Sequence, residues 1–96
     1  MIDERDPGAN GSLRIDRLLV YLRFARTRSN ARAMIERNSV RLNRVHVTRV
    51  SENVSVGDVM TLAQDGDVRI IEVLALPVRR TSPATAKQHY RELTRS

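Results

Sequence analysis

The sequence predicts an α+β fold in which an N-terminal helix hairpin packs on a small antiparallel sheet and a short helix closes the chain. Two observations predict it. Apolar residues recur with a helical period between residues 15 and 35, and they alternate with polar residues, as in half-buried strands, from residue 40 to residue 76. The chain has 96 residues, of which 41% are hydrophobic. This suffices for one small core, so one domain is expected.

Two helices are predicted before residue 39. The first runs from residue 15 to about residue 25, because its apolar residues fall at i, i+3, i+4 and i+7. The second begins after Thr27, which suits an N-cap, and Asn38 suits the left-handed residue that closes a helix. The predicted buried stripes are Ile15, Leu18, Leu19 and Leu22 in the first helix and Ala31, Met34 and Ile35 in the second.

Short strands are predicted after the hairpin, joined by turns. Residues 40 to 42 and 45 to 47 flank a tight turn at Asn43 and Arg44. Asn43 tolerates the positive φ that such a turn requires, and Arg44 tolerates it less well. Two further strands, at residues 59 to 62 and 68 to 76, complete a small antiparallel sheet.

A final helix is predicted from Ala84 to about Leu93. Ser82 suits its N-cap and Pro83 its first helical position. Phe24 lies on the far side of the first helix, where this C-terminal helix is expected to cover it; a partner-binding patch is the alternative. Residues 1 to 12 contain Pro7 and several small or polar residues, and a flexible arm is expected there.

Positive charge is concentrated in one part of the chain. Ten arginines lie between residues 14 and 49 against two acidic residues, a formal charge of +8, whereas the remainder sums to −2. A block of one sign attracts a polyanion, and arginine grips phosphate oxygens in pairs. An arginine-rich genome would explain the use of arginine in place of lysine, but not this clustering. Nucleic acid is therefore the first partner to consider.

Other functional classes find little support in the sequence. No run approaches the roughly 18 apolar residues of a membrane span, and the acidic N-terminus does not resemble a signal peptide, so a cytoplasmic protein is expected. The chain has no cysteine, no nucleophile beside a base, no paired carboxylates and no phosphate-cradling glycine loop. We therefore expect no catalytic activity, cofactor, metal site or small-molecule substrate.

Twelve residues are predicted to contact RNA, mainly through its shape and backbone, because only three aromatic residues are available to stack on bases. A rigid helix hairpin would fix a set of arginines, and residues of the first strand turn would extend the same patch. For each arginine the alternative is a solvated surface charge, and Asp16 is expected to cap its helix or pair with an arginine. The predicted contacts are Arg14, Arg17, Arg26, Thr27, Arg28, Ser29, Arg32, Arg41, Asn43, Arg44, Arg79 and Arg80.

Four blocks of the chain resemble the S4 RNA-binding domain. They are residues 14 to 19, 27 to 35, 40 to 43 and 56 to 59, in the order and spacing of that family. The resemblance implies the S4, or αL, motif over residues 13 to 62, preceded by the arm and followed by a C-terminal strand and helix extension of the same domain at residues 63 to 96. Asn38 and Arg44 depart from the family pattern, which usually has glycine at both positions.

Residues 23 to 28, residues 79 and 80 and the region of Tyr90 are similar to a subfamily of fifteen-kilodalton, ribosome-associated bacterial heat-shock proteins. That similarity implies a stress-response protein that binds ribosomal RNA on the large ribosomal subunit carrying a stalled nascent chain on tRNA, in ribosome rescue or recycling. Transfer RNA is a further candidate ligand, and a monomer is expected. The alternative is a generic basic module that binds DNA or an acidic protein partner.

Overall fold

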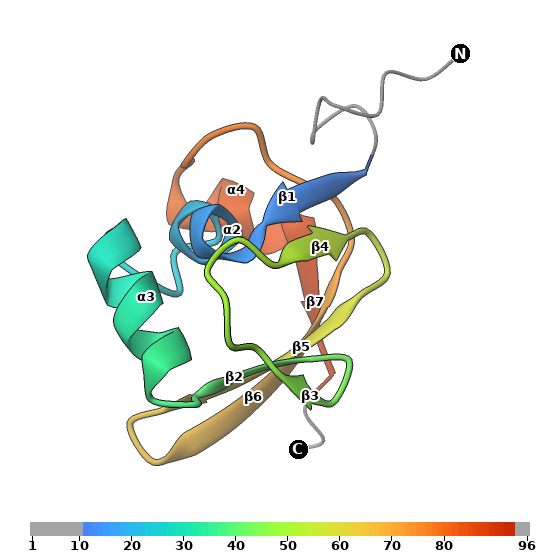
Figure 1. The fold of residues 1–96 in the computed structure, drawn as a ribbon. Coiled ribbons are helices and arrows are strands. Elements are labelled where there is room, and N and C mark those ends of the chain that lie inside the picture. Colours follow the sequence, from blue (N-terminus) through green and yellow to red (C-terminus); the bar gives the residue numbers. More distant parts are fainter. Residues whose placement is uncertain (1–10, 94–96) are drawn as a thin grey trace.

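The computed structural model describes residues 11 to 93, and Figure 1 shows how their helices and strands are arranged. The predicted α+β class is confirmed: helices pack on antiparallel strands. In chain order the elements are β1 (Ser12–Arg14), α2 (Ile15–Tyr21), α3 (Arg28–Glu36), β2 (Val40–Leu42), β3 (Val45–His46), β4 (Asn53–Ser55), β5 (Val59–Gln64), β6 (Asp67–Val73), α4 (Pro83–Ala86), the 3-10 turn η1 (Lys87–His89) and β7 (Tyr90–Glu92).

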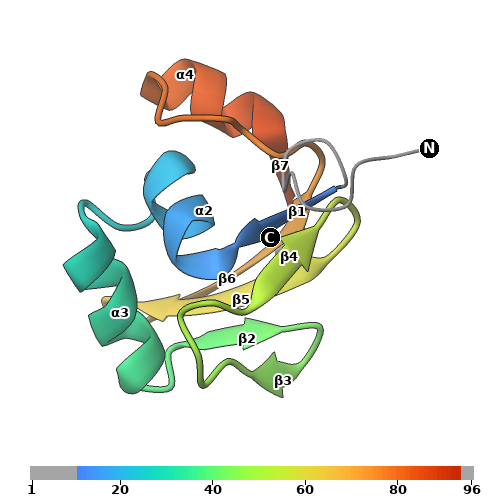
Figure 2. The same cartoon turned by 45° about the horizontal axis from the view of Figure 1, so that its top comes forward.

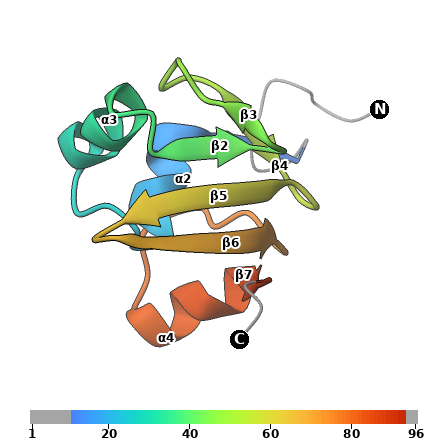
Figure 3. The same cartoon turned by 90° about the horizontal axis from the view of Figure 1, so that it is seen from below.

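The helices lie on one face of the larger sheet. That sheet has the strand order β3-β2-β5-β6-β7, and β1 pairs with β4 in a separate two-stranded sheet. Helices α2, α3 and α4 all lie on the same side (Figure 2), whereas the view from below shows β2, β5 and β6 with no element covering them (Figure 3). The sheet therefore has one face in the core and one open face.

The core lies between the helices and the inner face of the larger sheet. Both predicted helical stripes are buried, which confirms them. Side chains alternate along a strand, so every second residue of β2, β5 and β6 points toward the helices. The largest fully buried side chains are Ile15, Leu18, Leu19, Val40, Val54, Met60, Leu62, Ile71 and Val73.

Helix α2 ends at Tyr21, earlier than the predicted residue 25. Arg23 takes a left-handed φ of 68°, its N–H donates to the Val20 carbonyl at 3.0 Å, and the Phe24 N–H donates to the Leu19 carbonyl at 2.9 Å. These two bonds close the helix in the manner usually associated with glycine. The prediction was wrong because arginine gives no signal for this conformation. Helix α3 closes in the same way at Asn38, as predicted.

Strand β1 was not predicted. Ser12 pairs with Ser55, and Leu13 pairs with Val54, where both side chains are buried. Three residues carry too little periodicity to be recognised, and the strand exists because its partner lies about forty residues further along the chain. Residues 1 to 10 of the predicted arm lie outside the described residues.

The predicted C-terminal helix begins correctly but is too long. The Ser82 hydroxyl accepts a hydrogen bond from the Thr85 N–H at 3.3 Å, so the N-cap is confirmed. The helix and its 3-10 extension end at His89, and Tyr90 to Glu92 form β7 at the edge of the sheet. The expectation of a helix to Leu93 was wrong because strand pairing with β6 overrides local helical spacing.

Contacts across the sheet edge hold this C-terminal segment in place. The Arg69 guanidinium donates to both carboxylate oxygens of Glu92, at 2.7 and 3.1 Å, and lies 5.0 Å over the Phe24 ring. The rings of Phe24 and Tyr90 are 5.1 Å apart between centroids. The predicted cover of Phe24 by the C-terminal segment is thus confirmed, although Tyr90 belongs to a strand.

Candidate nucleic-acid interface

A buried carboxylate stands at the start of α2. Asp16 is only 3% exposed. Its backbone N–H donates to the Val50 carbonyl at 3.3 Å, and the preceding N–H of Ile15 donates to the Glu52 carbonyl at 2.8 Å. These bonds, together with the neighbouring β1–β4 pairing, fix the backbone at this position.

Two arginines bind this carboxylate, as predicted for Asp16. Arg14 donates from Nε to Oδ1 at 3.2 Å and from Nη2 to Oδ2 at 3.0 Å, and Arg28 donates from Nη2 to Oδ2 at 3.1 Å. Burial by itself would raise the pKa of Asp16, but the hydrogen bonds from Arg14 and Arg28 outweigh it and lower that pKa. Asp16 is therefore ionised at neutral pH and joins β1, α2 and α3.

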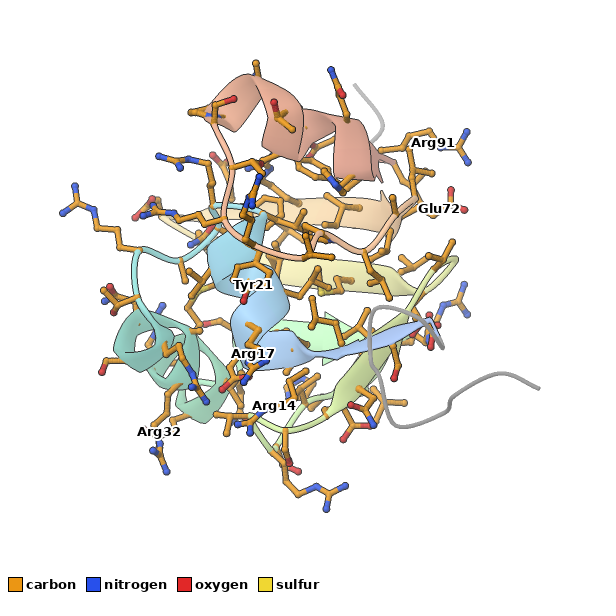
Figure 4. The ribbon with its side chains drawn as sticks, turned by 90° about the horizontal axis from the view of Figure 1, so that it is seen from above. Arg14, Arg17, Tyr21, Arg32, Glu72 and Arg91 are labelled. Atoms are coloured by element: carbon orange, nitrogen blue, oxygen red, sulfur yellow. The ribbon has the colours of Figure 1, made fainter. Side chains whose placement is uncertain are left out.

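The helix surface consists of Arg14, Arg17, Arg28, Ser29 and Arg32. Four of these residues line a hollow of about 360 Å³ together with Asp16 and Val50. Arg32 donates to Glu36 at 3.2 Å, an ion pair in which both side chains are about two-thirds exposed. The Arg17 guanidinium makes no hydrogen bond or ion pair with any residue from 11 to 93. Figure 4 shows Arg14 and Arg17 on the face turned to the viewer, with Arg32 beside them on α3.

Tyr21 belongs to the same region and was missed as a site residue. It lies one turn after Arg17 on α2 and is half-buried, and Figure 4 shows the two side chains along the same face of that helix. Its ring packs partly against the core, and an aromatic side chain beside arginines is the kind of group on which a base stacks. The i, i+4 spacing from Arg17 was the available signal.

A second basic region, the sheet-face surface, lies on the opposite side of the molecule. Val40 is buried beneath the helices, so its neighbour Arg41 points away from them, toward the open face. Arg41 and Arg44 line a hollow of about 640 Å³ over β2, β5 and β6. The expectation that these residues extend the helix patch is thus corrected. The alternation of β2 points Arg41 to the open face, and Arg44, in the turn after β2, borders the same hollow. The sheet-face surface comprises Arg41, Asn43, Arg44, Val59, Thr61, Ile70 and Leu93.

Besides the arginines that pair with Asp16 and Glu36, two predicted contact residues use their side chains within the fold. The Thr27 hydroxyl caps α3 by accepting from the Asn30 N–H at 3.1 Å. Asn43 accepts from the Val59 N–H at 2.9 Å and donates to Asp58 at 3.2 Å, which ties the β2–β3 turn to β5. Asn43 and Arg44 both have positive φ, so the predicted tight turn is confirmed.

The remaining predicted contacts lie in loops. Arg26 is exposed between α2 and α3, and Arg79 and Arg80 are exposed in the segment before α4. Arg23 donates to the Thr81 carbonyl at 2.9 Å, which brings these two loops together. Arg26, Arg79 and Arg80 have no ion pair within the described chain, so their guanidinium groups are available to a ligand.

Metal clusters and membrane-spanning helices are absent from the part of the chain that the structure describes. Within residues 11 to 93, no three histidine or acidic side chains gather as they would around a metal ion. None of the helices in that range has the length and apolar character needed to cross a bilayer.

Known proteins resemble this chain in sequence and in structure. The family model described as the S4 domain matches residues 13 to 60. The heat shock protein 15 homolog of Haemophilus influenzae is 36% identical over 84 residues, which is 88% of this chain and 63% of that protein. This chain therefore spans less than two-thirds of that relative's length.

A solved structure is also similar. It is heat shock protein 15 from Vibrio cholerae, described there as trimeric, and it superposes with a TM-score of 0.79 at 34% identity. The match covers 84% of this chain and 81% of the Vibrio chain. The similarity therefore extends over most of both chains.

Proposed function

Because this chain belongs to the S4 domain family of RNA-binding modules, we propose that it binds folded ribosomal RNA through the helix surface. The proposed target is the large ribosomal subunit carrying a stalled nascent chain on tRNA, and the proposed role is ribosome rescue or recycling in the cytoplasm, without catalysis. The similarity to heat shock protein 15 supports the proposal of a ribosome-associated, RNA-binding role. The observation that carries it is the set of arginines that β1, α2 and α3 place together on one side of the molecule.

The physical basis is an array of phosphate-binding groups on one side of the fold. Arg14 and Arg28 bind Asp16, and Arg17 and Arg32 project from α2 and α3. Arginine offers several N–H donors in a planar fork, which suits phosphate oxygens. Arg26, Arg79 and Arg80 would add contacts from the adjoining loops. Such an array reads the path of a backbone rather than the identity of bases.

The first test is equilibrium binding to a folded ribosomal RNA fragment and to a DNA duplex of equal length, over a series of salt concentrations. About five phosphate contacts give a log-log salt slope of roughly −3.5 to −4.5. RNA is expected to bind more tightly because its 2′-hydroxyl groups and A-form geometry differ from DNA. Equal affinity for both would favour the generic basic module, and no affinity for either would favour an acidic protein partner.

The second test asks for the ribosomal target. The protein is followed through a sucrose gradient of cell lysate at low and high salt, with and without stalled translation. Comigration with free large subunits that increases on stalling and weakens with salt is expected. A protein that remains at the top of every gradient would contradict the ribosomal role but leave RNA binding standing. Light scattering at the same concentrations would test the predicted monomer against the trimer described for the Vibrio relative.

A further inference from the structure

We infer that Asp16 is a positioning residue for RNA binding, one that holds the guanidinium groups of Arg14 and Arg28 side by side so that together they grip backbone phosphate. This inference rests on the proposed function and adds an acidic residue to a basic interface. It starts from a geometric fact: one buried oxygen, Oδ2, accepts from Nη2 of both arginines.

The carboxylate is itself immobile, which is what a positioning group needs. Hydrogen bonds from Ile15 and Asp16 to the 50–52 segment fix its backbone, and its Oδ1 also accepts the Arg17 N–H at 2.8 Å. Arg14 binds it through two parallel N–H groups, a geometry that defines the plane of the guanidinium as well as its position. The guanidinium groups bound to Asp16 are therefore held in place by the folded backbone around it.

The two arginines still have donors to offer. Their side chains are 38% and 57% exposed, and Asp16 engages only a minority of the five N–H groups that each carries. The remaining donors are available toward the hollow that Ser29 and Arg32 also line. A phosphate placed there would meet groups already oriented, so less conformational entropy is lost on binding.

A simple count of charges predicts the opposite effect of removing the Asp16 charge on RNA affinity. Removing a negative charge from a basic surface should strengthen its attraction for RNA. If Asp16 positions the arginines, removing its charge should instead weaken binding. The direction of the change therefore separates the two accounts.

The experiment measures the affinity for a folded ribosomal RNA fragment of the wild-type chain and two variants. Asp16→Asn keeps the shape of the side chain and is expected to weaken binding by about tenfold, the effect of freeing two ordered side chains. Glu36→Gln is the matched control, because it removes the exposed carboxylate that pairs with Arg32. That variant is expected to bind as well as the wild type or up to about threefold more tightly.

The outcomes separate the inference from the proposed function. A wild-type chain that does not bind RNA overturns the proposed function itself. If the wild type binds and Asp16→Asn binds equally or more tightly, the positioning role is wrong. Weakening of both variants to the same extent would also overturn it, since the buried carboxylate would then have no special part.

A measurement on the wild-type chain removes any dependence on how well the variant folds. Nitrogen relaxation reports the mobility of arginine Nε–H groups. We expect the Arg14 Nε–H group to be nearly as ordered as the rigid backbone, with an order parameter of about 0.85. The order parameter of the Arg17 Nε–H group should be below about 0.6. Equal mobility of the two side chains would contradict the inference even if the Asp16 variant could not be purified.

Discussion

The helix surface and the sheet-face surface both carry arginines, yet they hold them in different ways. On the helix surface, Arg14 and Arg28 bind a buried carboxylate. On the sheet-face surface, Arg41 and Arg44 have no ion pair with any residue that the structure describes, and they border half-exposed apolar side chains. The helix surface therefore holds two of its arginines at fixed positions, whereas neither arginine of the sheet-face surface is held by an ion pair with a described residue.

The charge pattern along the sequence does not show that these arginines lie on two separate surfaces. The stretch from residue 14 to residue 49 reads as one basic block, but the fold divides it between opposite sides of a sheet. Fixed arginines suit a ligand of defined shape, because their conformational entropy is already lost on folding. Arginines without such an anchor give general attraction that falls with salt. We therefore expect the helix surface to dominate RNA affinity.

Paired substitutions on the two surfaces should give the strongest contrast. Arg17→Gln with Arg32→Gln should weaken binding to folded RNA by roughly thirtyfold, about 1 kcal/mol for each guanidinium removed, and should make the salt slope shallower by about 2. Arg41→Gln with Arg44→Gln removes the same charge from the sheet-face surface and should cost less than about threefold. Equal losses of affinity in the two double variants would show that only net charge matters.

The pH dependence of stability tests the ion pairs that Asp16 makes beneath the helix surface. Because the folded-state pKa of Asp16 is lowered, its ion pairs stabilise the fold at every pH above the unfolded value of about 3.9, and this contribution is lost as pH falls through the folded-state pKa. Asp16→Asn should cost about 1–3 kcal/mol of unfolding free energy at pH 7.

The difference between wild type and Asp16→Asn should be constant between pH 5 and 8, roughly, and shrink below about pH 4. Urea unfolding of both proteins across this range measures it. Glu36→Gln, which removes an exposed ion pair, should change stability by less than about 0.5 kcal/mol at any of these pH values. A gap between Asp16→Asn and wild type that does not shrink at all between pH 5 and pH 2, roughly, would show that the carboxylate acts through packing rather than charge.

Asn43 tests where the RNA contact ends. Asn43→Ala removes its hydrogen bonds to Val59 and Asp58 and places alanine at a φ of 51°. Unfolding free energy should fall by about 1–2 kcal/mol, while RNA affinity should change by less than about twofold. Asn43→Gly relieves the backbone strain and still lacks the hydrogen bonds, so it separates the two causes. A large loss of affinity in a stable Asn43→Gly protein would restore this residue to the contact.

Arg44 should give the weakest response. It adopts a φ of 74°, in the left-handed region that favours glycine. Arg44→Gly should raise the unfolding free energy by about 0.5–1 kcal/mol, because glycine adopts this conformation without strain. Arg44→Ala removes the same charge but keeps the strain, so its stability should not rise. RNA affinity should fall only slightly in both variants, and a marked loss in both would assign Arg44 a direct contact.

Several elements of this protein could be predicted from short stretches of its sequence. Helical spacing placed the stripes that become α2 and α3, Thr27 and Ser82 identified two helix starts, and Asn43 with Arg44 identified a tight turn. Each of these signals depends on residues within one or two turns of each other. Local propensity and capping therefore suffice to predict them.

The other features depend on residues far apart in the chain, so they follow only from the folded arrangement. Strand β1 exists through pairing with β4, and Tyr90 lies in a strand because β6 is beside it. Arg23 ends α2 in a left-handed conformation that an arginine in the sequence does not predict. The division of the basic block into two surfaces, and the meeting of Arg14 and Arg28 at Asp16, follow from packing that no local pattern encodes.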